Sequence, residues 1–158
     1  MTDYHLEPTL REFEASITGW LREFAQVNEL FEAIDRGEPG ESNEPRWYVR
    51  LRGEEKEHIT VWFTLGQRTL RYEAYVLPAP QEHVAEVYEL ALRRNDRLVG
   101  AHFAIGVEDA IFLRGELPLA ALNEAELDRI IGSLYQYVEA NFPSLIRLAF
   151  ASKFPDNS

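Results

Sequence analysis

The sequence contains no cysteine. This absence excludes disulfide bonds, thiolate nucleophiles and cysteine-ligated zinc, and it suits a reducing compartment such as the cytosol. No apolar run approaches the roughly 20 residues needed to cross a bilayer. The opening residues also lack the basic region and apolar core of a signal peptide. We therefore expect a soluble, cytoplasmic protein that has no membrane partner.

Basic side chains are scarce as well. The chain carries 16 Lys and Arg against 27 Asp and Glu, a net charge of -11. Residues 1–45 hold 3 basic and 11 acidic side chains, while residues 46–158 hold 13 and 16. Nucleic-acid binding draws much of its affinity from Lys and Arg that neutralise phosphates. The charge balance therefore argues against a nucleic-acid partner.

Motifs that announce a reaction are missing. The four histidines form no H-E-x-x-H pair, and no G-x-S-x-G, G-x-x-x-x-G-K or G-x-G-x-x-G stretch is present. His83 and Glu86 stand at the i, i+3 spacing that could share a cation, but such a pair is usually solvated. Glu73 and Glu116 lie beside arginines, which lower a carboxyl pKa and favour an ion-pair ladder over acid catalysis. We predict no enzyme, no catalytic residue, no metal and no cofactor.

The hydrophobic pattern predicts one α+β domain. A chain of 158 residues with 46% hydrophobic side chains fits a single domain, here residues 1–155, with 156–158 as a tail. Apolar residues spaced by three and four predict one long helix up to Gly37: Leu10, Phe13, Ile17, Trp20, Leu21, Phe24, Val27, Phe31 and Ile34. The residues between Gly37 and Pro45 then form a surface loop.

From Arg46 on, the period of the apolar residues changes from about 3.6 to 2. Alternation predicts strands over 46–52, 59–65 and 70–77, a helix over about 81–95, and a hairpin of strands 100–105 and 110–117. Asn123 caps a last helix, with Glu126 three residues on, and Pro143 is expected to interrupt it. The predicted order is helix, three strands, helix, two strands, helix. Short connections favour a mostly antiparallel sheet with the helices on one face.

The second half of the chain resembles a known family. The stretches LRRNDRLVGAHFAI, IFLRGELPLAAL and ELDRIIGSL, together with Pro143, look like the C-terminal half of YbjN-family proteins. That family has the fold of type III secretion chaperones, whose element order resembles that of the whole chain. The resemblance implies a dimeric binding or regulatory module and supplies no catalytic residue.

The resemblance also implies a subunit interface. Dimers of the related fold form through the second helix and the last two strands, which here means Tyr88, Leu92, His102, Phe103 and Phe112. If Phe112 faces outward, Phe112→Glu is expected to weaken subunit or partner contact without unfolding the protein.

One face of the predicted sheet gathers aromatic and arginine side chains. If the apolar positions face the helices, alternation puts the others on the opposite face. Tyr, Trp and Arg are enriched at the centres of protein interfaces. The same residues also occur on sheets through ordinary cross-strand pairing. The candidate partner-binding residues are Tyr48, Arg50, Arg52, Trp62, Arg71, Tyr75 and Arg114.

Three functions remain open at this stage. The first is a non-enzymatic, chaperone-like or regulatory module that dimerises and binds a protein segment on its sheet. The second is a structural protein that associates only with itself. The third is a sensor of a small anionic ligand that uses the sheet-face arginines, which would need a concave pocket around them.

Overall fold

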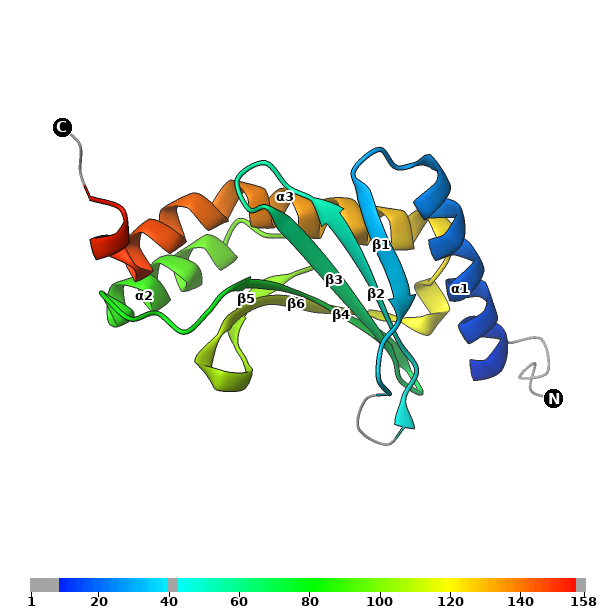
Figure 1. Cartoon of the computed structure of the whole chain (residues 1–158). Helices are drawn as coiled ribbons and strands as arrows, with labels where there is room; N and C mark the ends of the chain where they lie inside the picture. The colour runs from blue at the N-terminus through cyan, green and yellow to red at the C-terminus, as the bar shows by residue number, and fades with distance from the viewer. Residues whose placement is uncertain (1–8, 40–42, 156–158) are drawn as a thin grey trace.

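A computed structural model describes residues 9–39 and 43–155, so the expected tail 156–158 lies outside the described residues. Three long helices and six strands form an α+β domain (Figure 1). Short 3₁₀ turns follow β5, β6 and α3. The bounds are α1 (Leu10–Val27), β1 (Phe31–Arg36), β2 (Arg46–Arg52), β3 (His58–Leu65), β4 (Thr69–Leu77), α2 (Val84–Asn95), β5 (His102–Ile105), β6 (Ile111–Pro118) and α3 (Glu124–Ala149).

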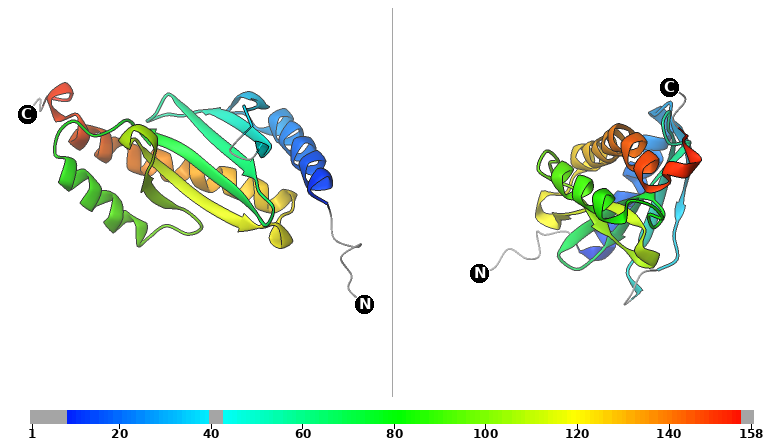
Figure 2. Two further views of the ribbon diagram at one scale, coloured as in Figure 1. Left: turned by 90° about the horizontal axis from the view of Figure 1, so that it is seen from below. Right: turned by 90° about the vertical axis from the view of Figure 1, so that its left-hand side faces the viewer.

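The strands form one antiparallel sheet in the order β1-β2-β3-β4-β6-β5. The α3 helix runs across the sheet and packs on β3 and β4, while α1 and α2 lie at opposite ends of it (Figure 1). Seen from the end of the molecule, α2 and α3 lie on the same side of the sheet (Figure 2, right). The α+β class and the antiparallel sheet are confirmed.

The prediction that the first helix extends to Ile34 is wrong. The α1 helix ends at Val27, because Asn28 turns extended (φ -91°, ψ 122°) and its side-chain oxygen accepts a hydrogen bond from the Leu30 N–H at 2.8 Å. The chain then returns as β1 against β2. A bulge between Phe31 and Ala33 shifts the register by one residue. Phe31 and Ile34 are thus three residues apart yet both pack against the core, and this spacing imitates a helix.

The prediction that Pro143 interrupts the last helix is also wrong. The α3 helix continues through Pro143 to Ala149, although proline removes one N–H donor from the ladder. The buried Asn141 lies beside it and donates its side-chain N–H to the Tyr137 carbonyl at 2.7 Å. Asn141 also accepts from Arg94 of α2 at 2.6 Å, so this stretch of α3 is fastened to its neighbour. The Asn123 cap is confirmed: its side chain accepts from the Glu126 N–H at 2.9 Å.

The predicted assignment of the two sheet faces is confirmed. Alternate residues of β2, β3 and β4 are buried against the helices, as expected from the period of two. The largest of these core side chains include Trp47, Leu51, Ile59, Phe63 and Leu70. The register therefore fixes which residues share the opposite face, because Tyr48 pairs with Trp62, Trp62 with Glu73, and Glu73 with Arg114.

Candidate functional site

The sheet face that points away from the helices, which we call the open face, is hollowed across five strands. The hollow has a volume of about 990 Å³. The side chains that shape its floor come from β2, β3, β4 and β6, and the residues around β5 close one side. The lining residues that carry charge or an aromatic ring are Arg46, Trp62, Arg71, Tyr72, Glu73, His102, Arg114 and Glu116.

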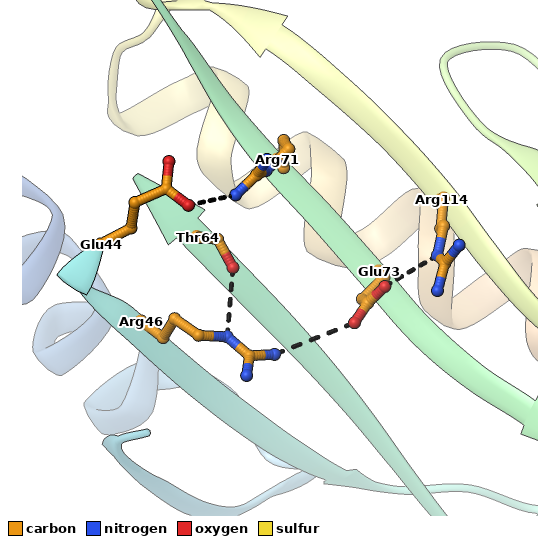
Figure 3. Close-up of polar contacts among 6 residues, drawn as sticks. All are labelled: Glu44, Arg46, Thr64, Arg71, Glu73 and Arg114. Carbon is orange, nitrogen blue, oxygen red and sulfur yellow. Dashed lines mark hydrogen bonds and ion pairs between the residues drawn. The ribbon is translucent and has the colours of Figure 1, made fainter. Parts of the chain in front are cut away.

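A single carboxylate, that of Glu73, links two of the arginines in the hollow (Figure 3). Arg114 donates from Nε to Glu73 at 2.9 Å, and the Arg46 guanidinium lies 3.8 Å from the other Glu73 oxygen. Arg46 also donates from Nε to the Thr64 hydroxyl at 3.2 Å. Glu73 is therefore at the centre of the expected ion-pair ladder, which joins β2, β4 and β6, and the Thr64 hydroxyl of β3 adds a hydrogen bond to it.

The third arginine of the hollow takes a partner that the strand register does not suggest. Arg71 stands opposite Glu116 in the sheet, but its guanidinium donates to Glu44, 2.5 Å away in the connection before β2 (Figure 3). Glu116 instead accepts from the Thr69 hydroxyl at 3.1 Å. The expected ladder is therefore wrong for Glu116.

Two aromatic pairs support the guanidinium groups. The Tyr48 and Trp62 rings pack in a tilted arrangement with centroids 5.1 Å apart, and Arg46 lies 4.7 Å above the Trp62 ring. Tyr75 and Phe112 meet edge to face at 5.6 Å. Cation–π contact of this kind orients a guanidinium and leaves its N–H edges free to bind acceptors.

The expectation that Phe112 is an exposed contact is wrong. Its register partner is Tyr75, so it does point to the open face. The side chain is nevertheless only 8% exposed. The Arg114 guanidinium lies 4.8 Å from its ring, and Gly106 approaches it so closely that a Cβ there would lie 2.4 Å from a ring carbon. Phe112→Glu would remove this packed ring and bury a carboxylate in its place, so the variant tests folding and not association.

The seven predicted partner-binding residues divide into two groups. Trp62, Arg71 and Arg114 line the hollow, while Tyr48 packs against Trp62 and Tyr75 packs against Phe112. Arg50 and Arg52 lie further along β2, outside the hollow, and Arg50 Nε is 3.7 Å from Glu32.

Arg46 lines the hollow and Glu44 lies at its rim, although neither was among the predicted binding residues. Arg46 lies two residues before Tyr48 on the same strand, so the alternation of buried and outward residues in β2 would have placed it on the open face. His102 was predicted for the subunit interface, and it lines the hollow.

A lysine and a tyrosine lie at one end of the open face. Lys56 lies over the Tyr75 ring at 5.4 Å and donates to the His58 carbonyl at 2.9 Å. Burial lowers the pKa of Lys56, and the nearby Glu139 carboxylate partly offsets that effect. Burial also raises the pKa of Tyr75, with a smaller contribution from Glu108.

A second, apolar depression lies between α2 and the edge strand β5. It has a volume of about 360 Å³, and we call it the α2–β5 groove; it is lined by Tyr88, Ala91, Leu92, Phe103, Ala104, Ile105 and Ile111. Leu92 is 68% exposed and Ile105 51% exposed. Three of the five residues predicted for a subunit interface, Tyr88, Leu92 and Phe103, thus meet here. His102 and Phe112 lie toward the open face.

Residues 9–39 and 43–155 lack the features of a metal site and of a membrane-spanning helix. Within these ranges, no group of three or more His, Asp or Glu side chains is placed to hold a metal ion. His83 Nδ1 lies 3.6 Å from Glu86 on the exposed surface of α2. None of the helices in the same ranges combines the length and apolar character needed to cross a membrane.

Comparison with known proteins identifies relatives of this chain. Uncharacterized proteins of Mycobacterium bovis and Mycobacterium tuberculosis are 35% identical over 108 residues, which is 68% of this chain and 59% of theirs. An uncharacterized protein of Mycobacterium leprae is 32% identical over 107 residues, 68% of this chain and 58% of its own. The chain thus spans about three fifths of the length of these relatives. The YbjN family model, described as "Putative bacterial sensory transduction regulator", matches residues 10–147. This match covers the six strands and the three helices of the described chain, except for the last two residues of α3. The chain therefore belongs to the YbjN family.

Proposed function

We infer that this YbjN-family protein is a non-enzymatic, cytoplasmic regulatory module with a chaperone-like task, which holds a protein segment on the open face of its sheet. One observation carries this proposal. The face without helices presents a hollow bordered by aromatic rings and arginines, the residue types enriched at interface centres.

The reach of the hollow across the strands and its charged lining favour a segment of chain over a small molecule. It reaches from Arg46 on β2 to His102 on β5, so an occupant that fills it must cross most of the sheet. Binding pockets for small ligands are mostly apolar and enclosed. This hollow is instead polar and open, and its arginines can donate to the backbone carbonyls and acidic side chains of an extended peptide.

A selection experiment tests the proposal. A phage-displayed library of random dodecapeptides is selected on the wild-type protein after depletion on Trp62→Ala, whose circular dichroism must match the wild type. The enriched peptides are expected to bind wild type and Val27→Ala alike, since Val27 is 79% exposed on α1. They should bind Trp62→Ala at least about tenfold more weakly, the loss of a central aromatic contact. Peptides that bind all three proteins equally would contradict the proposal.

A second part of the proposal is a homodimer built on the α2–β5 groove. The groove combines exposed apolar side chains with an edge strand whose outer side pairs with no described strand. Charge along α2 is divided: Glu86 and Glu89 lie in its first half, while Arg93 and Arg94 lie in its last turn. A second α2 that runs antiparallel about a twofold axis would place acidic against basic halves, which suits a self-complementary interface.

Leu92→Glu tests the dimer better than Phe112→Glu, because Leu92 is exposed and its replacement costs little folding energy. Light scattering at several concentrations should give twice the 18.3 kDa chain mass for wild type. Leu92→Glu should shift toward the single-chain mass, while Val27→Glu, a matched charge change on α1, should not. A wild-type mass of one chain at high concentration would refute the dimer and leave the open-face proposal standing.

A further inference from the structure

The arginines of the open face have many unused hydrogen-bond donors. A guanidinium carries five N–H donors. Arg46, Arg71 and Arg114 each donate one hydrogen bond within the described part of the chain: to Thr64, to Glu44 and to Glu73. The Arg46–Glu73 contact of 3.8 Å is an ion pair but too long for a hydrogen bond. The hollow is therefore rich in donors that a ligand with many acceptor oxygens can use.

These guanidinium groups are held in place before any ligand arrives. Trp62 supports Arg46 and Phe112 supports Arg114, at 4.7 and 4.8 Å. The side chains of Arg46 and Arg114 are 26% and 37% exposed, so they lie against the floor of the hollow. A donor that is already ordered loses less conformational entropy when it binds, which raises affinity.

The arginines of the hollow contact carboxylates of the chain itself, which indicates the kind of ligand group that they can bind. Glu73 lies between Arg114 and Arg46, and Glu44 reaches Arg71 from the connection before β2 (Figure 3). Glu73 belongs to a strand at the floor. Glu44 comes instead from outside the sheet and meets Arg71 at the rim, where the Arg71 side chain is 53% exposed. Glu44 thus occupies the position that a carboxylate of a bound segment would take.

We propose that the open face binds an acidic segment of a partner protein, whose carboxylates contact Arg46 and Arg114 and displace Glu44 from Arg71. This inference rests on the proposed function and names the class of segment that it binds. The net charge of the chain does not prevent such binding. A Debye length of about 8 Å at physiological salt screens the acidic residues outside the hollow. Inside it, the three arginines Arg46, Arg71 and Arg114 face two carboxylates, those of Glu73 and Glu116, so the charged lining is net positive.

Three synthetic dodecapeptides of one design test the charge preference: six repeats of Glu-Ser, Gln-Ser or Lys-Ser. Each is titrated into ¹⁵N-labelled full-length protein at 0.15 M salt and followed by NMR. The Glu-Ser peptide should shift the Trp62 indole N–H and the backbone signals of β4 and β6. The Gln-Ser and Lys-Ser peptides should bind at least about tenfold more weakly, because charge-assisted hydrogen bonds are about twice as strong as neutral ones.

Variants separate recognition by the hollow from general attraction. Arg71→Gln and Arg114→Gln should each weaken the Glu-Ser peptide about tenfold, while Arg22→Gln, which removes the same charge from α1, should leave its affinity unchanged. Glu44→Gln should strengthen binding several-fold, because it weakens the competitor for Arg71. A purely structural Glu44 would not give this gain.

Other outcomes overturn the inference. Equal binding of the Lys-Ser peptide, or shifts centred on the α2–β5 groove, would refute it. Full competition by inorganic phosphate at the same sites would identify a small-anion site in place of a segment site. The phage selection keeps the two proposals apart: if it enriches peptides that depend on Trp62 but carry no acidic residues, the proposed function stands and the acidic segment is refuted.

Discussion

The loop between β2 and β3 offers a sharp test of how the open face is held in shape. Glu139 of α3 accepts hydrogen bonds from three successive backbone N–H groups, those of Glu54, Glu55 and Lys56, at 2.8, 2.9 and 3.2 Å. Consecutive N–H groups that converge in this way form a nest for an anion. The contact fastens the loop to α3 and positions Lys56 against Tyr75.

Glu139→Gln keeps the size of the side chain but turns one acceptor oxygen into an NH₂ donor. At least one backbone N–H then faces another donor. A hydrogen bond to a charged group contributes about 1.5–3 kcal/mol. The loop residues Glu54 and Glu55 are exposed, so water replaces part of the loss. We expect the free energy of unfolding to fall by about 2 kcal/mol, and Tm to fall by about 4–8 °C for a chain of this size.

Urea denaturation followed by tryptophan fluorescence measures this change. Glu54→Gln is the matched control, because it makes the same chemical change in the loop that Glu139 holds and leaves the three backbone N–H groups paired with Glu139. It should change the free energy of unfolding by less than about 0.5 kcal/mol. If Glu139→Gln and Glu54→Gln have the same small effect, the three hydrogen bonds do not hold the loop.

Two further predictions concern side chains next to the hollow. Phe112→Ala should lower the free energy of unfolding by about 3 kcal/mol, against less than about 0.5 kcal/mol for the exposed Val27→Ala; equal values in urea denaturation would mean that Phe112 is not packed. Because burial lowers the Lys56 pKa from 10.5, the folded protein binds fewer protons there than the unfolded chain. The buried charged ammonium therefore lowers the free energy of unfolding at pH values below the folded pKa. The free energy of unfolding rises again as the pH increases from the folded pKa to 10.5, and Lys56→Met should abolish this rise. NMR titration of ¹³C-labelled lysine should show Lys56 deprotonating below 10.5; a midpoint at or above 10.5 would contradict the assigned burial.

The faces of the sheet were predictable because a period of two leaves little choice. Trp62 and Arg114 had to lie on the side opposite Phe63 and Leu113, and antiparallel pairing brought Glu73 beside Arg114. The Phe31–Ile34 strand was not predictable from spacing, because its bulge gives apolar residues three positions apart. Proline usually ends a helix, yet α3 continues through Pro143.

The partners of long side chains were harder to predict than the faces. Arg71 stands opposite Glu116 but reaches Glu44, whose loop position no local pattern indicates. The residues around Glu54 look like a solvated charged turn, and only the fold brings Glu139 to them from 85 residues away in the chain. Contacts of this kind depend on tertiary packing and leave no periodic signal.

The central claim is that a protein segment binds on the open face. The most direct test is NMR mapping of a dodecapeptide selected on the wild-type protein. We expect the largest shifts to fall on the Trp62 indole and on β4 and β6, and to vanish in Arg114→Gln. Shifts confined to Tyr88, Leu92 and Ile105, unchanged in Arg114→Gln, would place the binding surface on the α2–β5 groove and contradict the claim.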